Sequence, residues 1–335
     1  MKIDIVGGSL AGLSTAISLK RFDKNIDVTI HEKHKEIGYN PEGRRCGEGH
    51  TVEAEWRKWK PIGKSIFNEI KIVETILENK KYIARFPPEV FYVLNRQEFI
   101  SQLGRDAKKL GVTIQTNDKI KSSNDLSGDY IVDASGCPSS IKRDLGIDKG
   151  YRGISYQQTL EDSNCFISDV IKVFFTDALG YYWIFPRDPE KREINVGVGV
   201  LDYSRDFNLK QMLESFKEKQ GLEGKINYVL GGMVPAGLQK PLSYQNILFV
   251  GDAGVGTHPL LGKGIYRALY SGELAAKYIA LGHPEKYAKI AVHEFIKWDL
   301  IGKTYIKIDK ILFKIGKKAV LSMYHHYLDF WYSFH

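Results

Sequence analysis

The beginning of the chain contains the pattern that most limits its fold. Residues Lys2 to Val6 read as a buried strand, a glycine-rich turn follows, and a helix is predicted from about Ala11 to Phe22. A second strand then ends at Glu32. This strand–helix–strand order predicts a parallel sheet covered by helices, and therefore an α/β protein. We expect a Rossmann-type domain at this position.

The turn Gly7-Gly8-Ser9-Leu10-Ala11-Gly12 resembles G-x-G-x-x-G, with serine at the middle glycine. The first glycine permits a tight turn, and the last lets the helix pack closely on the strand. The amides at the helix N-terminus can meet a pyrophosphate, and an acid at the tip of the second strand can accept both ribose hydroxyls. The sequence therefore predicts an adenine-dinucleotide site with the residues Gly7, Gly8, Leu10, Ala11, Gly12, Glu32 and Lys33.

A second glycine-rich segment favours FAD over NAD. A strand is predicted over 247–250, followed by Asp252, a loop over 259–264 and a helix from about Lys263 to Ala280. An aspartate at a strand tip can hold a ribityl hydroxyl, which NAD lacks, and a helix N-terminus stabilises negative charge at a flavin N1–C2=O. We therefore expect the cofactor FAD, held here by Gly251, Asp252, Gly262 and Gly264.

The segment 40–49 concentrates unusual residues. A turn is followed by Arg44, Arg45 and the run Cys46-Gly47-Glu48-Gly49. Glycine lets backbone approach a flat group closely, and neighbouring cations and amides favour a thiolate. Cys46 is thus the candidate catalytic residue, donating a proton or orienting a water; the alternative is a small buried apolar residue. Arg45 is assigned to the cofactor site.

The other titratable residues of this region are not assigned a catalytic role. We expect Glu48 to pair with an arginine and His50 to begin the next helix. His31 and His34 have no metal-ligand partners at useful spacing, so no metal site is predicted.

Three blocks resemble the aromatic-hydroxylase superfamily of flavoproteins: the N-terminal glycine motif, DYIVDASGCPSSIKR and VGDAGVGTHPLLGKGI. Within that superfamily, RRCGEG and YYWIFPRDPEKREINVGVG are similar to the geranylgeranyl reductase family. The resemblance implies FAD contacts at Ala11, Glu32, Cys46, Gly47, Gly49, Arg96, Asp252, Gly264 and Ile265, and a backbone contact near Ile120.

The aromatic stretch of that last block is the candidate substrate site. Side chains alternate along a strand, so Tyr181, Trp183 and Phe185 share one face, and Pro186 closes it. Such a face is either ordinary sheet core or an apolar wall for a ligand. The resemblance favours the wall and implies that Tyr181, Trp183, Phe185 and Pro186 bind substrate.

We predict three parts of the chain. A discontinuous FAD-binding domain comprises 1–62, 90–150 and 245–283, and a mostly antiparallel β-sheet substrate domain is inserted as 63–89 and 151–244. The C-terminal helical segment, 284–335, alternates lysines with apolar residues. Its helices either pack over the substrate domain or lie on an anionic membrane surface.

Charge and cysteine content limit the partners. The net charge is +8, but the basic residues are scattered and no nucleic-acid-binding motif is present, which argues against nucleic acid. The odd number of cysteines, three, favours a reducing compartment. We expect a cytoplasmic protein, with peripheral contact on the inner face of the membrane as the alternative for the tail.

The predicted function is FAD-dependent reduction of C=C bonds in geranylgeranyl or other prenyl chains of isoprenoid lipids, by hydride transfer from reduced flavin N5. The resemblance carries this prediction. One alternative is an FAD-dependent monooxygenase of an aromatic or polycyclic substrate, and another is a non-catalytic flavoprotein electron carrier. The electron donor, a ferredoxin-like protein or a reduced nicotinamide, stays open.

Overall fold

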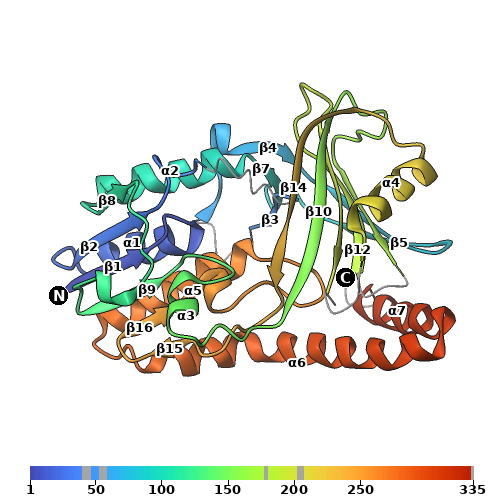
Figure 1. The fold of residues 1–335 in the computed structure, drawn as a ribbon. Coiled ribbons are helices and arrows are strands. Elements are labelled where there is room, and N and C mark those ends of the chain that lie inside the picture. Colours follow the sequence, from blue (N-terminus) through green and yellow to red (C-terminus); the bar gives the residue numbers. More distant parts are fainter. Residues whose placement is uncertain (40–46, 53–58, 177–179, 202–206, 333–335) are drawn as a thin grey trace. The chain divides into compact units, whose positions relative to one another are not determined.

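A computed structural model describes the chain except residues 40–46, 53–58, 177–179, 202–206 and 333–335 (Figure 1). The chain divides into two compact units. Unit 1 comprises Met1–Pro41, Arg96–Tyr151 and Val234–Gly302, and unit 2 comprises Glu42–Asn95, Arg152–Met233 and Lys303–His335. Compared with the boundaries expected from the sequence, 42–62 and 90–95 fall in unit 2, 234–244 falls in unit 1, and the C-terminal segment is shared.

Unit 1 is built on a six-stranded sheet in the order β15-β16-β9-β1-β2-β8. All neighbouring strands are parallel except the short edge strand β15. The strands are β1 (Lys2–Val6), β2 (Asp27–Glu32), β8 (Thr113–Thr116), β9 (Tyr130–Asp133), β15 (Ser243–Tyr244) and β16 (Ile247–Phe249). The prediction of a Rossmann-type α/β domain is confirmed.

The helices of unit 1 follow the strands as the glycine motifs predict. They are α1 (Leu10–Phe22), α2 (Arg96–Lys109), η3 (Ser123–Asp125), α3 (Ser140–Asp144), η4 (Gly251–Ala253), α5 (Ile265–Ala280) and the first part of α6 (Lys286–Ile315). Helices α1 and α5 cross at close range: a Cβ added to Gly272 would lie 2.2 Å from the Ser14 hydroxyl and 2.4 Å from the carbonyl oxygen of Ala11. The two glycine-motif helices therefore pack directly against each other.

Unit 2 holds a seven-stranded sheet in the order β14-β10-β13-β12-β11-β5-β6, with a second sheet β3-β7-β4. Its elements are β3 (Gly49–Thr51), η2 (Gly63–Ser65), β4 (Ile66–Glu69), β5 (Ile72–Leu77), β6 (Lys80–Arg85), β7 (Phe91–Leu94), β10 (Arg152–Glu161), β11 (Val170–Phe175), β12 (Gly180–Pro186), β13 (Ile194–Val200), α4 (Leu209–Gln220) and β14 (Lys225–Pro235). Strands β10, β13, β12 and β11 run antiparallel, whereas β11 and β5 pair in parallel. The predicted mostly antiparallel sheet is confirmed.

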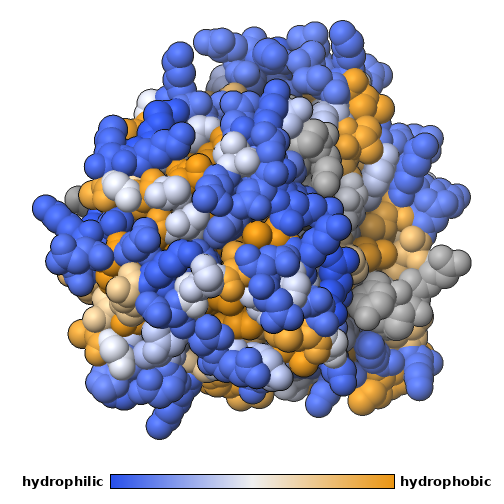
Figure 2. All heavy atoms as spheres, turned by 60° about the vertical axis from the view of Figure 1, so that its left-hand side comes forward, coloured by the Kyte–Doolittle hydropathy of each residue, from blue (hydrophilic) through white to orange (hydrophobic). Residues whose placement is uncertain are grey.

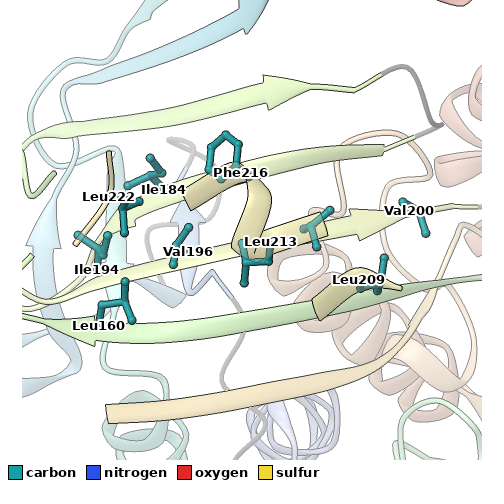
Figure 3. Packing of buried hydrophobic residues seen from close by; sticks show 10 residues of the cluster. Leu160, Ile184, Ile194, Val196, Val200, Leu209, Leu213, Phe216 and Leu222 are labelled. Carbon is teal, nitrogen blue, oxygen red and sulfur yellow. The ribbon is translucent and has the colours of Figure 1, made fainter. Parts of the chain in front are cut away.

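One face of the large sheet is covered by α4. Figure 3 shows Leu209, Leu213 and Phe216 of this helix pointing toward strand residues such as Val196 and Ile184. Because side chains alternate along a strand, this packing leaves Tyr181, Trp183 and Phe185 on the opposite face. The sheet therefore has one closed core face and one aromatic face.

The C-terminal helix α7 (Lys317–Tyr332) packs over β5, β6 and β11. The hydroxyls of Thr75 and Tyr332 lie 2.7 Å apart, the Tyr82 hydroxyl donates to Asp329 at 2.7 Å, and the rings of Phe175 and Tyr324 are 5.0 Å apart. Among the described residues, no helix is long and apolar enough to span a bilayer. The reading in which tail helices pack over the substrate domain therefore holds for α7.

Figure 2 shows the distribution of hydropathy on one face of the molecule. On the face drawn in Figure 2, hydrophilic side chains cover most of the surface, and hydrophobic residues form smaller areas between them.

Candidate active site

The first glycine turn has the geometry expected for a dinucleotide site. Gly7 has φ 102°, and a Cβ added there would lie 2.8 Å from the carbonyl oxygen of Ala134, so only glycine fits without strain. Ser9, which replaces the middle glycine of the motif, caps α1 by accepting from the amide of Gly12 at 3.3 Å. The departure from the motif therefore supplies a helix cap.

Glu32 lies beside this turn, at the tip of β2. One carboxylate oxygen accepts from the Gly8 amide at 2.7 Å, and the other accepts from the His34 amide at 2.9 Å. Each carboxylate oxygen has two lone pairs, so capacity for ribose hydroxyls remains. Lys33, the next residue, is exposed.

The second glycine segment lies directly against the first. A Cβ added to Gly251 would be only 2.7 Å from the Cβ of Ala11, although 240 residues separate them in sequence. Asp252 is held in the short helix η4. Gly264 is the N-cap of α5 and provides no side-chain cap, which leaves the N-terminal amides of a 16-residue helix starting at Ile265 for a ligand.

Two charged residues that the sequence did not single out shape this second segment. Arg267 donates to the carbonyl oxygens of Gly256 at 3.0 Å and Val255 at 2.6 Å, and to Asp299 at 3.1 Å. Asp299 also accepts from the amide of Leu238. Both side chains are buried. Since Arg267 lies amid the apolar pattern of a helix and its partner is 32 residues away, only the fold reveals the pair.

The loop between Asp252 and Gly264 contains a neutral histidine, His258. Nδ1 of His258 accepts from the amides of Leu260 and Leu261, each at 3.3 Å, and the Gly262 amide donates to the carbonyl oxygen of His258 at 2.9 Å. Burial lowers the pKa of His258 to about 3. The loop is therefore ordered by an uncharged side chain.

The remaining predicted contacts of unit 1 lie at other places. Arg96 is the first residue of α2. The side chain of Ile120 is buried with Val6 and Ile131, and its segment borders a pocket of about 310 Å³ that is lined by Lys119, Ile120, Lys121, Ser140, Arg143 and Asp144. The backbone of Ile120 can therefore offer a contact, whereas its side chain belongs to the core.

In unit 2, the predicted aromatic face is present. The rings of Tyr181 and Trp183 meet edge to face at 5.9 Å, and the indole N–H of Trp183 donates to Gln157 at 3.0 Å. Strand β13 makes room for this indole, because a Cβ added to Gly197 would lie 2.2 Å from it. Burial raises the pKa of Tyr181, so its phenol stays protonated.

Phe185 differs from the other two aromatics. A Cβ added to Gly47 or Gly49 would come within 2.8 or 2.9 Å of its ring. The sequence predicted that these glycines approach a flat group, and within unit 2 that group is Phe185. Phe185 also packs with Phe91 and Ile171, and Pro186 ends the strand in a buried position.

The neighbours of this turn give one confirmation and one correction. Glu48 pairs with an arginine as expected, and that arginine is Arg187, with Nε 2.6 Å from the carboxylate. His50 does not begin a helix: it is buried in the strand β3, and burial lowers its pKa to about 4. Strand pairing of His50 with Tyr92 overrides the turn-rich composition before it.

Two predicted residues lie outside the described part of the chain: the candidate catalytic residue Cys46 and its neighbour Arg45. Within the described part, no group of three or more His, Cys, Asp or Glu residues is arranged to hold a metal ion. His31, a residue of β2, instead lies between Asp118 at 2.7 Å and Asp4 at 3.3 Å.

Two segments of the chain match models of known protein families. Residues 153–234 match a family model described as geranylgeranyl reductase catalytic domain, and residues 5–69 match an NAD(P)-binding Rossmann-like domain. The first match spans β10 to β14, including the aromatic strand β12.

Two curated relatives are similar to most of the chain. The chain is 26% identical to a digeranylgeranylglycerophospholipid reductase of Methanothrix thermoacetophila, over 84% of this chain and 78% of that protein. It is 29% identical to digeranylgeranylglycerophospholipid reductase 2 of Methanosphaera stadtmanae, over 96% and 87%.

Among solved structures, a geranylgeranyl bacteriochlorophyll reductase-like protein from Thermoplasma acidophilum matches with a TM-score of 0.81 at 22% identity, covering 96% of this chain and 89% of that one. The flavin-dependent halogenase CmlS shares the fold at a TM-score of 0.68 and 19% identity, over 89% and 62%. Residues 153–234 are thus similar to a geranylgeranyl reductase catalytic domain, and most of the chain is similar to digeranylgeranylglycerophospholipid reductases. The solved structures share its fold.

Proposed function

We propose that this protein is an FAD-dependent oxidoreductase that reduces C=C bonds in the prenyl chains of isoprenoid lipids. The observation that carries the proposal is the catalytic-domain match over 153–234, which contains the aromatic face built from Tyr181 and Trp183. The relatives named as digeranylgeranylglycerophospholipid reductases, which match most of the chain, support the same substrate class.

The residues of unit 1 fit FAD. The turn Gly7–Gly12 and the carboxylate of Glu32 suit the adenosine end, and Asp252 with the uncapped N-terminus of α5 suits the ribityl and ring end. Their direct contact at Ala11 and Gly251 supports one long ligand rather than two separate ones. The full set proposed to bind FAD is Gly7, Gly8, Leu10, Ala11, Gly12, Glu32, Lys33, Arg45, Cys46, Gly47, Gly49, Arg96, Ile120, Gly251, Asp252, Gly262, Gly264 and Ile265.

When bound and reduced, FAD supplies a hydride from N5 to one alkene carbon while a proton reaches the other, so each C=C bond gains two hydrogens. The aromatic face offers ring surface along which an apolar chain can lie without water. Tyr181 is protonated and therefore adds no charge to that face. Cys46 is proposed to donate the proton or to orient the water that donates it.

Reduction of the bound flavin requires an electron donor. A ferredoxin-like protein and a reduced nicotinamide are both proposed. The described glycines of β13 lie in a strand against Trp183, not before a helix, and so do not form a second dinucleotide turn. Measuring flavin bleaching anaerobically with each donor separates the two.

The C-terminal segment is proposed to contact an anionic membrane surface. Along α6, the exposed residues Ile308, Ile311 and Ile315 follow helical spacing on one face. Lys307 and Lys314 are exposed beside them, whereas the acid within this stretch, Asp309, is buried. Apolar side chains flanked by cations fit the interface of an anionic bilayer.

The function is tested with photoreduced holoprotein and a geranylgeranyl lipid under anaerobic conditions. We expect the flavin to reoxidise and the lipid to gain mass in steps of two hydrogens. Consumption of oxygen and NADPH with an aromatic substrate, without lipid reduction, would instead support a monooxygenase. Absence of turnover with either substrate would leave an electron carrier.

A further inference from the structure

A buried ion cluster lies directly beside the turn Gly47–Gly49. It consists of Glu48, Arg187 and Glu193, whose side chains are all less than a tenth exposed. Arg187 follows the last residue of β12, and Glu193 precedes β13, so the cluster sits where the two strands are connected. None of these residues belongs to the predicted flavin contacts or to the aromatic face.

The guanidinium of Arg187 joins the two carboxylates. Its Nε donates to Glu48 at 2.6 Å, and Nη1 donates to Glu193. Asn195 adds a hydrogen bond to the same oxygen of Glu48 at 3.3 Å. The guanidinium also lies 4.0 Å above the ring of Phe67. Arg187 is therefore held in one orientation from several sides.

A cluster of this composition is poorly suited to stabilising the fold. Two buried carboxylates share the guanidinium of Arg187, and desolvation offsets much of the attraction in buried ion pairs. Glu48 is also in the left-handed region, with φ 63°, which a non-glycine residue rarely adopts. Strained backbone held by buried charges is typical of functional sites.

Two residues at the end of β12 and directly after it contact the turn 47–49. The ring of Phe185 lies against the backbone of Gly47 and Gly49, and Arg187, the residue directly after the strand, holds the side chain of Glu48 between these glycines. The carbonyl oxygen of Glu48 in turn accepts from the amide of Leu94 at 2.9 Å. Backbone, ring and guanidinium together fix the turn relative to the aromatic face.

We propose that Arg187 is a positioning residue that acts through Glu48. It holds the turn 47–49 in register with the aromatic face, so that the residues on this turn and the bound prenyl chain keep a fixed geometry. The inference rests on the proposed function for its catalytic consequence. Its structural consequence, the placement of the turn, can be measured without turnover.

The test compares Arg187→Ala, Arg187→Lys and Glu48→Gln with a control, Lys191→Met, which removes an exposed lysine from the same β12–β13 connection. For Arg187→Ala we expect kcat for lipid reduction to fall by roughly a hundredfold with little change in KM, because misplacement of a positioned group affects the chemical step. Added guanidinium should restore part of the activity, and Lys191→Met should behave as wild type.

The second readout is hydrogen exchange at the amide of Leu94, which reports the placement of Glu48 directly. We expect faster exchange in Arg187→Ala and Glu48→Gln than in Lys191→Met. Unchanged Leu94 exchange would overturn the proposal, as would a wild-type kcat in Arg187→Ala. If Arg187→Ala does not fold, Arg187→Lys and Glu48→Gln give the same comparison. If the wild type reduces no lipid, the proposed function fails, while Leu94 exchange still decides the positioning role.

Discussion

At the scale of single residues, substitutions of two glycines distinguish the cost of backbone strain from the cost of steric crowding. Gly251 and Gly282 both have positive φ, 56° and 71°. A Cβ on Gly251 would lie 2.7 Å from the Cβ of Ala11, whereas one on Gly282 would have nothing within 4 Å. We expect Gly282→Ala to cost about 1–2 kcal/mol of unfolding free energy from strain alone. Gly251→Ala should cost more and weaken FAD binding, as measured by urea unfolding and flavin titration. Equal losses in the two variants would contradict a direct contact between the two glycine segments.

The same scale shows what the sequence could and could not predict. Tyr181 and Trp183 were placed on one face by alternation, a local rule, and the structure keeps them there. Phe185 follows the same alternation, but its ring packs against Gly47 and Gly49, which lie more than 130 residues earlier in the sequence. Arg187 and Glu193 escaped prediction for the same reason, because a buried charge is recognised only with its partner in place. The local sequence pattern therefore predicts which face of the sheet a side chain lies on, whereas its contacts depend on residues that are distant in the sequence.

At the scale of elements, the pair β12 and β13 makes a sharp prediction about the aromatic face. A Cβ on Gly197 would lie 2.2 Å from the indole of Trp183, whereas one on Gly199 would lie at 3.4 Å, an ordinary contact. We expect Gly197→Ala to displace the indole, shift tryptophan fluorescence and slow lipid reduction. Gly199→Ala in the same strand should leave both nearly unchanged. Similar behaviour of the two variants would show that Trp183 does not depend on this gap.

Helix α6 carries the prediction for membrane contact. Replacing Ile308, Ile311 and Ile315 by serine should reduce co-sedimentation with vesicles containing phosphatidylglycerol, because both apolar burial and nearby lysines contribute. The matched control replaces Ile226, Val229 and Met233, which are also exposed apolar residues but lie on β14. Binding of the wild type should weaken with added salt. Wild-type binding to vesicles of phosphatidylcholine alone, or equal losses in both triple variants, would contradict an anionic lipid surface.

At the scale of the whole molecule, His258 in unit 1 and His50 in unit 2 each report on the stability of the unit that contains them. Burial lowers the pKa of His258 in unit 1 to about 3 and that of His50 in unit 2 to about 4, from an ordinary value of 6.5. Below pH 6.5 the unfolded chain binds a proton at each of these positions, whereas the folded chain does not. The free energy of unfolding therefore decreases as the pH is lowered from 6.5 to the folded-state pKa. Each histidine should contribute a slope of about 1.4 kcal/mol per pH unit.

These two slopes test whether the units unfold together. Urea unfolding between pH 7 and pH 5 is compared for the wild type, His258→Gln and His50→Gln. If unfolding is one cooperative transition, each variant should lower the pH dependence of the same midpoint. If the units unfold separately, His258→Gln should flatten only the transition of unit 1, and His50→Gln only that of unit 2. A pH dependence unchanged in both variants would mean that neither histidine is held neutral by burial.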